Sequence, residues 1–310
     1  MGAGHTHDGG HEAGRAADRR RLLLVLAVTG GVALVELVGA WLSGSLALLA
    51  DAGHMFTDAA ALVLALSASL LASRPATPRR TFGYHRAEIF AALVNALVLL
   101  GICGFLVVTG LRRLGRPTDV DAGQLLVFAG IGLVANVTSL AVLASRDRDN
   151  LNMRGAFLEV LSDTAGSVAA IVAGVVILST GFLRADPIAS LAIAALILPR
   201  SFALLRESVG VLLEAAPPGI EVDDVRGHLC GVDGVIDVHD LHAWQITSGL
   251  PALSAHVRVT DAALAERGVG PLLDELSACV AECFGIQHAT FQLEPASHVA
   301  HERLGDSEHA

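Results

Sequence analysis

The chain has 310 residues, of which 53% are hydrophobic and only 17% are charged, and its mean hydropathy is +0.59. A water-soluble domain of this length carries closer to a quarter charged residues, so the composition indicates a membrane protein. Acidic residues outnumber basic ones by 31 to 21, which argues against a nucleic-acid binder with its basic surface. The four cysteines are too few and too scattered for the disulfide framework of a small secreted protein.

Six apolar stretches follow one another along the chain, and each is about as long as the ~20 residues that a helix needs to cross a bilayer. They cover residues 22–43, 46–72, 88–111, 123–144, 155–182 and 186–205. The first follows three arginines and looks like a signal peptide. It is too long for one and five more stretches follow, so we interpret it as a retained helix. An even number of spans places both ends of the chain on the same side of the membrane.

The arginines indicate which side that is. If the N-terminus is inside, thirteen arginines lie in the inner segments, and the outer loops hold only Arg112, Arg113, Arg116 and Arg184. Positively charged residues concentrate on the cytoplasmic side of membrane proteins. This distribution therefore predicts a multi-pass protein of the cell inner membrane with both termini in the cytoplasm.

The composition changes after the sixth stretch. The cluster of helix breakers at residues 214–219 (EAAPPG) ends the last helix and begins a new unit. Beyond it, the pattern predicts a helix, two strands, a helix and a strand, at residues 221–230, 234–247, 252–260, 268–284 and 288–294. This order suits a small two-layer α+β domain. We expect four parts: a His-containing tail (1–20), a six-helix membrane domain (21–210), the α+β domain (211–295) and a polar tail (296–310).

Two of the apolar stretches contain paired polar side chains. His54 and Asp58 are four residues apart on the second, with Asp51 one turn earlier, and Glu159 and Asp163 are four apart on the fifth, so each pair lies on one helix face. A charge inside the membrane costs roughly 2.5–3.5 kcal/mol on insertion scales, so these groups require a reason to be there.

If the two helices face one another, the four side chains can converge on a cation in the tetrahedral arrangement that zinc prefers. The alternative is a salt-bridged or protonated cluster that packs the helices together around a few trapped waters. No arginine is expected near the acids inside these spans. We therefore favour a metal or proton site over packing.

Longer motifs resemble the cation diffusion facilitators. Three segments carry the resemblance in the membrane region, namely Ser45–Asp58 (SLALLADAGHMFTD), Thr81–Glu88 (TFGYHRAE) and Asn152–Ala156 (NMRGA). Two more, Val238–Trp244 (VHDLHAW) and His288–Glu294 (HATFQLE), are similar to the bacterial zinc-type branch. The resemblance covers about residues 20–295. It implies six membrane helices, a ferredoxin-like cytoplasmic domain, a homodimer, and export of a divalent metal in exchange for protons.

Carried over by position, the resemblance implies a transport site made of His54, Asp58, Glu159 and Asp163. Zinc-type members usually have a second histidine where this chain has Glu159. The change gives one nitrogen and three oxygen ligands, which makes Mn²⁺, Fe²⁺ or Co²⁺ more plausible as alternatives to Zn²⁺. Three carboxylates also exceed the charge of a divalent ion, so we expect Glu159 to hold a proton in at least one state. Zinc remains the first choice for the transported ion.

Exchange for protons follows from the chemistry of such a site. Ligands lose protons when they bind metal, so metal and protons compete for the same groups. A histidine exchanges protons near neutral pH, and His54 is therefore suited to this competition.

A second metal site is expected in the α+β domain, because relatives bind zinc there. Its ligands would be His239, His256, His288 and Glu294, with zinc as a regulatory ion, and Gln292 stands where some relatives have histidine. The alternative is that the strand histidines only line a half-exposed sheet face. His85, in the loop after the second stretch, is more simply a solvated residue than a ligand.

The remaining candidates receive simpler interpretations. Cys279 and Cys283 are expected to pack on an apolar helix face. The histidine-containing ends would collect metal weakly, through His5, His7, His11, His298, His301 and His309. Asn95, Asn136 and Glu36 also lie inside the spans, where such residues bond across helices or line a pathway, and all three are left unassigned.

Two other functions fit the sequence less well than transport. A membrane-anchored metal sensor would gain nothing from paired acids inside the membrane. An intramembrane metalloenzyme would require three protein ligands and a bound water, but the chain has no HExxH-type motif. The sequence therefore predicts a secondary transporter rather than an enzyme.

Overall fold

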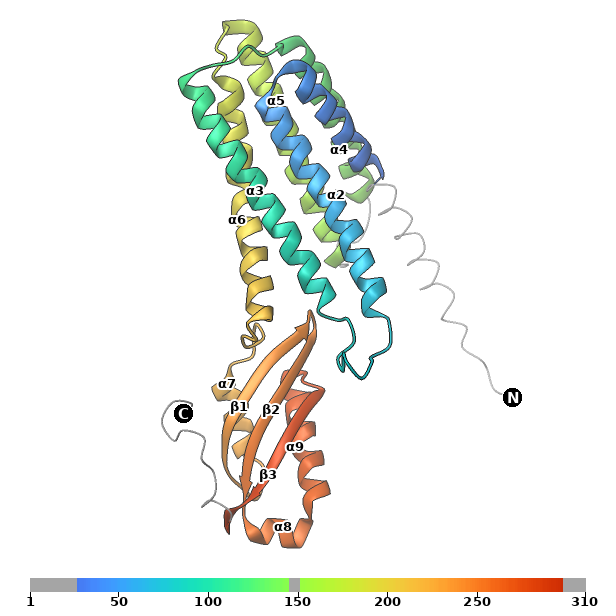
Figure 1. Cartoon of the computed structure of the whole chain (residues 1–310), viewed down its shortest axis with the longest axis vertical. Coiled ribbons are helices and arrows are strands. Elements are labelled where there is room, and N and C mark those ends of the chain that lie inside the picture. Colours follow the sequence, from blue (N-terminus) through green and yellow to red (C-terminus); the bar gives the residue numbers. More distant parts are fainter. Residues whose placement is uncertain (1–26, 145–150, 298–310) are drawn as a thin grey trace, which may run out of the picture. The chain divides into compact units, whose positions relative to one another are not determined.

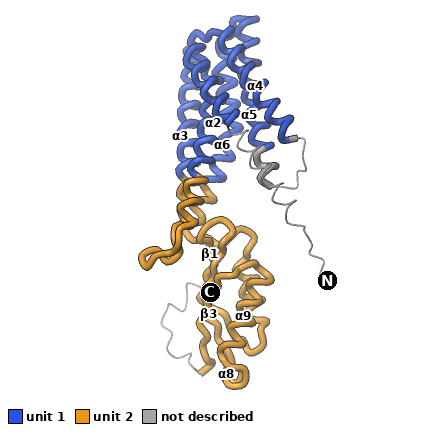
Figure 2. The backbone as a smooth tube through the Cα atoms, turned by 90° about the vertical axis from the view of Figure 1, so that its right-hand side faces the viewer, with its two compact units in different colours: residues 1–64, 94–204 blue, residues 65–93, 205–310 orange. Residues whose placement is uncertain are grey.

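The computed structural model describes residues 27–144 and 151–297, and it describes side chains in the second of these ranges from residue 157 onward. The chain divides into two compact units (Figure 2), residues 1–64 with 94–204 and residues 65–93 with 205–310. Each unit is described separately below.

Long helices dominate the chain (Figure 1). Five of the described helices are long and apolar enough to cross a membrane. They are α2 (Leu46–Ala72), α3 (Ala87–Gly115), α4 (Ala122–Ala144), α5 (Leu151–Thr180) and α6 (Ala185–Leu212). A shorter apolar helix over Ala27–Ser43 precedes them, and the beginning of the predicted first span lies outside the described residues. The expected multi-pass helical architecture is confirmed.

The boundaries of these helices follow from local chemistry. Gly44, with a φ of 70°, adopts the left-handed conformation that glycine tolerates best, which lets the chain reverse between the first helix and α2. Helix α6 continues to Leu212, beyond the predicted end at residue 205, because the breaker cluster begins only at residue 214.

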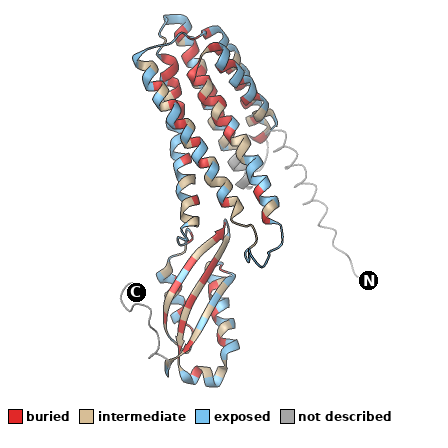
Figure 3. Cartoon of the chain, in the orientation of Figure 1, coloured by how far each residue is buried: buried red, intermediate tan, exposed pale blue. Residues whose placement is uncertain are grey.

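Small residues fill the inner faces of the helical unit. Ala47, Ala50, Ala129 and Ala170 are all fully buried in its core, where they let the helices approach closely. Large apolar side chains point outward instead, as Val134 and Leu178, both 68% exposed, illustrate. Figure 3 shows this division into buried and exposed helix faces. An apolar exterior of this kind requires lipid around it.

The second unit contains a three-stranded sheet in the order β1-β2-β3. Strands β1 (Val235–Thr247) and β2 (Leu250–Val259) form an antiparallel hairpin, and β3 (His288–Pro295) pairs parallel to β2. Alternate strand residues, such as Val257 and Leu253, pack against α7 (Val222–Cys230) and α9 (Val269–Phe284). The polar residues between them occupy the opposite face of the sheet.

The predicted α-β-β-α-β order is confirmed within this sheet domain, and one short helix was missed. Helix α8 (Asp261–Arg267) lies between β2 and α9. Thr260 caps it by accepting a hydrogen bond from the backbone N–H of Ala263 at 3.1 Å. The residues between β2 and α9 were predicted to form a loop, so this short helix was not expected.

Candidate metal sites

Three of the four predicted intramembrane ligands converge in the helical unit. His54 Nδ1 lies 3.2 Å from Asp58 Oδ2, and His54 Nε2 lies 3.9 Å from Asp163 Oδ1. Each residue offers one ligand atom such that all three atoms lie within 4.8 Å of one another. The spacing of four residues on α2 and the approach of α5 produce this cluster, as expected from the sequence.

The cluster is buried and its polar atoms are unsatisfied. The side chains of His54, Asp58 and Asp163 are 5%, 15% and 1% exposed. Among the described residues, no side-chain or backbone group forms a hydrogen bond with His54 Nδ1, Asp58 Oδ2 or Asp163 Oδ1. Buried polar atoms normally have partners, so their lack of them here indicates a site made to receive a ligand. One imidazole nitrogen and two carboxylate oxygens suit a divalent metal.

Glu159 lies beside this cluster but is paired with a base. Arg200 Nη2 on α6 donates a hydrogen bond to Glu159 Oε2 at 2.6 Å. The expectation that no arginine lies near these acids was therefore wrong. Arg200 was counted with the inner arginines, and only the packing of α6 beside α5 shows its partner. The ground for expecting a proton on Glu159 is removed, since Arg200 supplies the countercharge.

The start of α2, which carries His54 and Asp58, is held by a residue from another helix. Asp186 at the beginning of α6 is fully buried and accepts hydrogen bonds from the Ser45 hydroxyl at 2.5 Å and the Leu46 and Ala47 N–H groups at 2.8 and 3.1 Å. These N–H groups belong to the first turn of α2. The N–H groups of a first turn have no acceptor within their own helix, so Asp186 supplies one. The sequence analysis missed Asp186, since a cap from a distant helix leaves no local motif.

Asp51 has different partners from the other acids of α2. Its Oδ2 accepts a hydrogen bond from the Ser167 hydroxyl at 3.0 Å, and the Asn136 amide donates to Ser167 Oγ at 3.3 Å. Asn136 on α4 therefore bonds across to α5, which is one of the two roles that the sequence left open for it. Asp51 is not one of the three clustered ligands.

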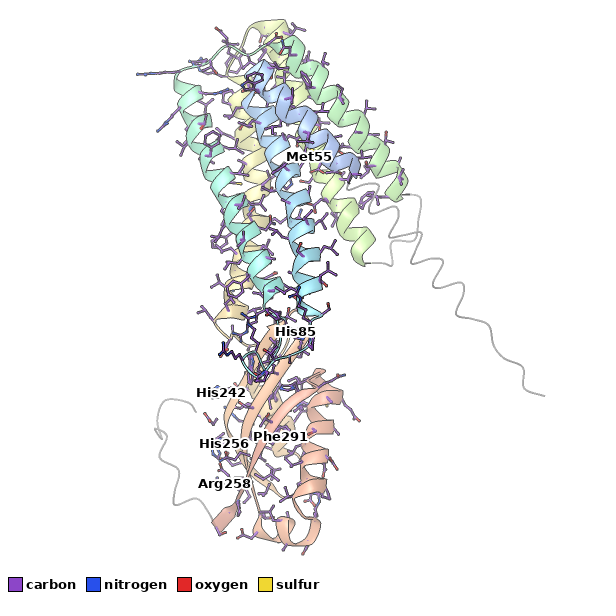
Figure 4. The ribbon with its side chains drawn as sticks, turned by 45° about the vertical axis from the view of Figure 1, so that its right-hand side comes forward. Met55, His85, His242, His256, Arg258 and Phe291 are labelled. Carbon is purple, nitrogen blue, oxygen red and sulfur yellow. The ribbon has the colours of Figure 1, made fainter. Side chains whose placement is uncertain are left out.

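A second cluster lies on the polar face of the sheet. Glu294 Oε1 is 2.9 Å from His256 Nδ1, and Glu294 Oε2 is 3.3 Å from His239 Nε2. These three residues again offer ligand atoms within 4.8 Å of one another. Gln292 donates a hydrogen bond to Glu294 Oε1 at 2.8 Å and so orients the carboxylate. Figure 4 marks His256 on this sheet, together with His242 and Arg258.

An irregularity in β1 adds a further acid to this face. The register shifts between His239 and His242, and Asp240 within the shift has a φ of 48°. This bulge lets the Asp240 carboxylate approach two histidines, at 3.0 Å from His242 Nε2 and 3.7 Å from His256 Nε2. The sequence did not predict this role for Asp240, because a regular alternation of side chains along β1 places it on the other face of the sheet from His239.

His288 does not join the sheet cluster, contrary to the expected ligand set. In the parallel register it pairs with Ala252, whereas Gln292 pairs with His256. Four residues along a strand span about 13 Å, so the His288 side chain lies too far away to share an ion with His256. It packs instead edge-on against the Phe82 ring, with 5.6 Å between ring centres.

His85 and His288 both line a small cavity of about 190 Å³, with Arg74, Phe82 and Ile246 among the other lining residues. No acid or cysteine lines this cavity, and the described residues form no ligand cluster with His85.

The cysteines and the histidine-containing tails complete the list of candidates. Cys279 packs against the apolar core of the sheet domain, as expected, whereas Cys283 is exposed. Burial raises the pKa of the Cys279 thiol, and the neighbouring Cys283 raises it further. The six tail histidines lie outside the described residues.

Comparison with known proteins identifies the family. Residues 22–213 match the family model described as the cation efflux transmembrane domain, and residues 217–296 match that of the cation efflux protein cytoplasmic domain. The chain belongs to the cation efflux family. Members of this family are transporters, so the expectation that the chain is not an enzyme is confirmed. The resemblance to the zinc-type branch of the cation diffusion facilitators, which the sequence motifs indicated, is likewise confirmed.

Several characterised members are similar over nearly their whole length. The metal cation efflux system protein CzcD of Cupriavidus metallidurans is 41% identical, with 96% of this chain and 91% of that protein covered. The zinc transporter ZitB of Escherichia coli is 39% identical over 100% of this chain and 99% of its own. A cadmium, cobalt and zinc/H⁺-K⁺ antiporter of Bacillus subtilis is 38% identical, with 93% of each chain covered.

Solved structures match the chain as well, and one of them is a domain of a relative named above. The metal-bound C-terminal domain of the CzcD transporter is 35% identical to this chain, covers 24% of it and 99% of that domain, and gives a TM-score of 0.21.

Proposed function

We propose that this cation efflux protein exports Zn²⁺ from the cytoplasm across the inner membrane in exchange for protons. The observation that carries the proposal is the buried cluster of His54, Asp58 and Asp163 inside apolar helices. Its ligand atoms lie within 4.8 Å of one another, and one polar atom of each residue has no hydrogen-bond partner among the described residues. Relatives named for zinc, cadmium and cobalt support the choice of a divalent ion.

Glu159 is the fourth ligand in this proposal. Its carboxylate also lies near enough to Asp58 for the two to interact, so a metal held by Asp58 is within its reach. A divalent ion entering the cluster competes with Arg200 for Glu159, and the carboxylate turns toward the ion. Tetrahedral coordination by one nitrogen and three oxygens results.

The pairing with Arg200 favours zinc over harder ions. The alternative of a carrier selective for Mn²⁺, Fe²⁺ or Co²⁺ depended on a third carboxylate fully available to the metal. Arg200 draws charge from that carboxylate through a short hydrogen bond. The site then offers one strong oxygen donor fewer than its sequence suggests.

The test is metal-driven proton flux in proteoliposomes, measured with Zn²⁺, Cd²⁺, Co²⁺, Mn²⁺ and Fe²⁺. Zn²⁺ is expected to give the largest flux, and Glu159→His to retain it. Asp163→Ala, in folded protein, is expected to abolish it, while Glu207→Ala, at an exposed acid on α6, serves as the matched control. A larger flux with Mn²⁺, Fe²⁺ or Co²⁺ that shifts to zinc in Glu159→His would instead assign selectivity to the third carboxylate. Full activity of Asp163→Ala would contradict the proposed site.

The sheet cluster is proposed as a regulatory zinc site formed by His239, His256 and Glu294, with Asp240 as a further acid. The protein is further proposed to act as a homodimer, as the family resemblance implies, with both termini in the cytoplasm, as the arginine distribution favours. Glu294→Gln in the full chain is expected to remove one class of bound zinc while the intramembrane site stays loaded. Because a histidine must be free of its second proton to bind a metal, protons compete with zinc at this site, and zinc binding is expected to weaken at acidic pH. Zinc stoichiometry of purified protein at pH 7.5 and 5.5 checks both expectations, and an unchanged stoichiometry in Glu294→Gln would contradict the site.

A further inference from the structure

Polar side chains from four helices meet in the helical unit, apart from the three clustered ligands. They are Glu36 on the first helix, Asp51 on α2, Asn136 on α4 and Ser167 on α5, and all four are at most 1% exposed. The hydroxyl of Ser167 connects Asp51 and Asn136 through the hydrogen bonds described above. Asp51 therefore has a donor for its charge.

Glu36 has none. Both of its carboxyl oxygens are buried, and no described group forms a hydrogen bond with either of them. The carboxyl group lies over Gly132 of α4, where a Cβ atom would come within 1.8 Å of Glu36 Oε1 and 3.3 Å of Ser167 Oγ. Glu36 thus points toward the Ser167–Asp51 pair. Gly166 makes room for Asp51 in the same way, since a Cβ there would lie 2.2 Å from Asp51 Oδ1.

Within the described part of the chain, the charged groups that act on Glu36 are acidic. Asp51 on α2 and Asp163 on α5 act on it electrostatically. Helix α4, which packs over the carboxyl group, contains no charged residue. Arg113 and Arg200 pair with Asp186 and Glu159 instead. A buried carboxylate without a donor and beside other acids is strongly unfavourable, so a small cation must neutralise it.

We propose that Glu36 is a proton-binding residue of the transport cycle, separate from the metal ligands. It holds a proton while the metal site is empty. A divalent ion bound at Asp163 adds positive charge nearby, which favours the ionised carboxylate, and Glu36 releases its proton toward Asp51. The surroundings are oxygens alone, which do not suit zinc. This inference rests on the proposed function, since it requires metal at the intramembrane cluster.

The test counts the protons released when Zn²⁺ binds. Full-length protein in detergent micelles is titrated with Zn²⁺ calorimetrically in two buffers of different ionisation enthalpy, which gives the number of protons per metal. Glu36→Gln is expected to bind Zn²⁺ and to release about one proton fewer than the wild type. Glu36→Asp, which keeps a carboxyl group, is expected to restore most of that release. An unchanged proton count in folded Glu36→Gln would overturn the assignment.

A glycine pair gives a second approach that leaves Glu36 in place. Gly132→Ala puts a methyl group where the carboxyl group lies and is expected to lower the proton count, whereas Gly130→Ala, with nothing within 4 Å of its Cβ, is expected to leave it unchanged. Equal counts in the two variants would contradict the proposal.

The titrations are repeated in potassium and in choline salts. Competition by K⁺ that is present in the wild type and absent in Glu36→Gln would assign the position to an alkali ion and overturn the proton. A wild-type protein that binds no Zn²⁺ would instead refute the proposed function, on which the inference depends.

Discussion

At the residue scale, the pairing of Glu159 with Arg200 changes the chemistry of the predicted ligand set. His54, Asp58 and Asp163 face one another, and each has one buried polar atom without a hydrogen bond from the described residues, while Glu159 is held by a short hydrogen bond from α6. The sequence could predict the three-residue cluster because a spacing of four residues places side chains on one helix face. It could not predict the partner of Glu159, which depends on how α5 and α6 pack.

A double-mutant cycle tests whether the ion pair matters for transport. Glu159→Gln and Arg200→Gln are each expected to slow Zn²⁺ transport, since each leaves a charge without its partner inside the helical unit. The double variant is expected to lose less than the sum of the two, with a coupling of about 0.5–3 kcal/mol. Initial rates of Zn²⁺ uptake into inverted vesicles measure the four proteins. Arg206→Gln, at an exposed arginine on the same helix, is the control, and strictly additive effects would show that the pair is only a neighbouring contact.

At the element scale, the agreement between sequence and structure was best where one face of an element is buried. The strands were predicted within a few residues because β2 alternates buried and half-exposed positions. Register was not predictable. The bulge at Asp240 and the parallel pairing of β3 decide that His239, His256 and Glu294 meet and that His288 does not. Both depend on pairing between distant segments, which leaves no pattern within a strand.

The contribution of Asp186 to the stability of α2 can be tested by substitution. Asp186→Asn keeps the size of the side chain but removes the charge that accepts the N–H groups of Leu46 and Ala47. We expect a loss of unfolding free energy of about 1–2 kcal/mol, together with weaker Zn²⁺ binding because His54 and Asp58 lie on this helix. Thermal unfolding and Zn²⁺ titration in detergent measure the two effects.

Asp121→Asn is the matched control for that experiment. Asp121 caps α4 by accepting from the Gln124 N–H at 3.0 Å, but it is exposed. A smaller loss of stability and no change in Zn²⁺ binding are expected. Equal effects of the two substitutions would show that the buried cap from α6 does not position the site.

At the scale of the whole molecule, the sequence predicted a membrane protein with a separate sheet domain from composition and periodicity. These signals are strong because lipid-facing helices need about 20 apolar residues and a sheet needs alternation. Orientation in the membrane is a different matter, since it was inferred from arginines alone. The native cysteines allow it to be measured.

Cys230 and Cys283 are exposed on the sheet domain, whereas Cys103 is buried. A membrane-impermeant maleimide is expected to label the two exposed thiols in inverted vesicles and neither in spheroplasts, because the proposed orientation has the sheet domain in the cytoplasm. Cys279 is expected to react slowly, as its raised pKa leaves little thiolate at neutral pH. The variant with Cys230→Ser and Cys283→Ser is the control. Labelling in spheroplasts would reverse the inferred orientation.

In the proposed transport cycle, the ion pair beside the intramembrane cluster also decides how the membrane voltage acts on the protein. Arg200 cancels the charge of Glu159, so Asp58 and Asp163 leave two negative charges, which equal the charge of one divalent ion. The loaded cluster is then electrically neutral, and the potential does no work when it moves. An empty, unprotonated cluster carries two charges, each worth roughly 2.3 kcal/mol per 100 mV across the full field. Voltage therefore acts on the return step, and two protons at the cluster make that step neutral as well.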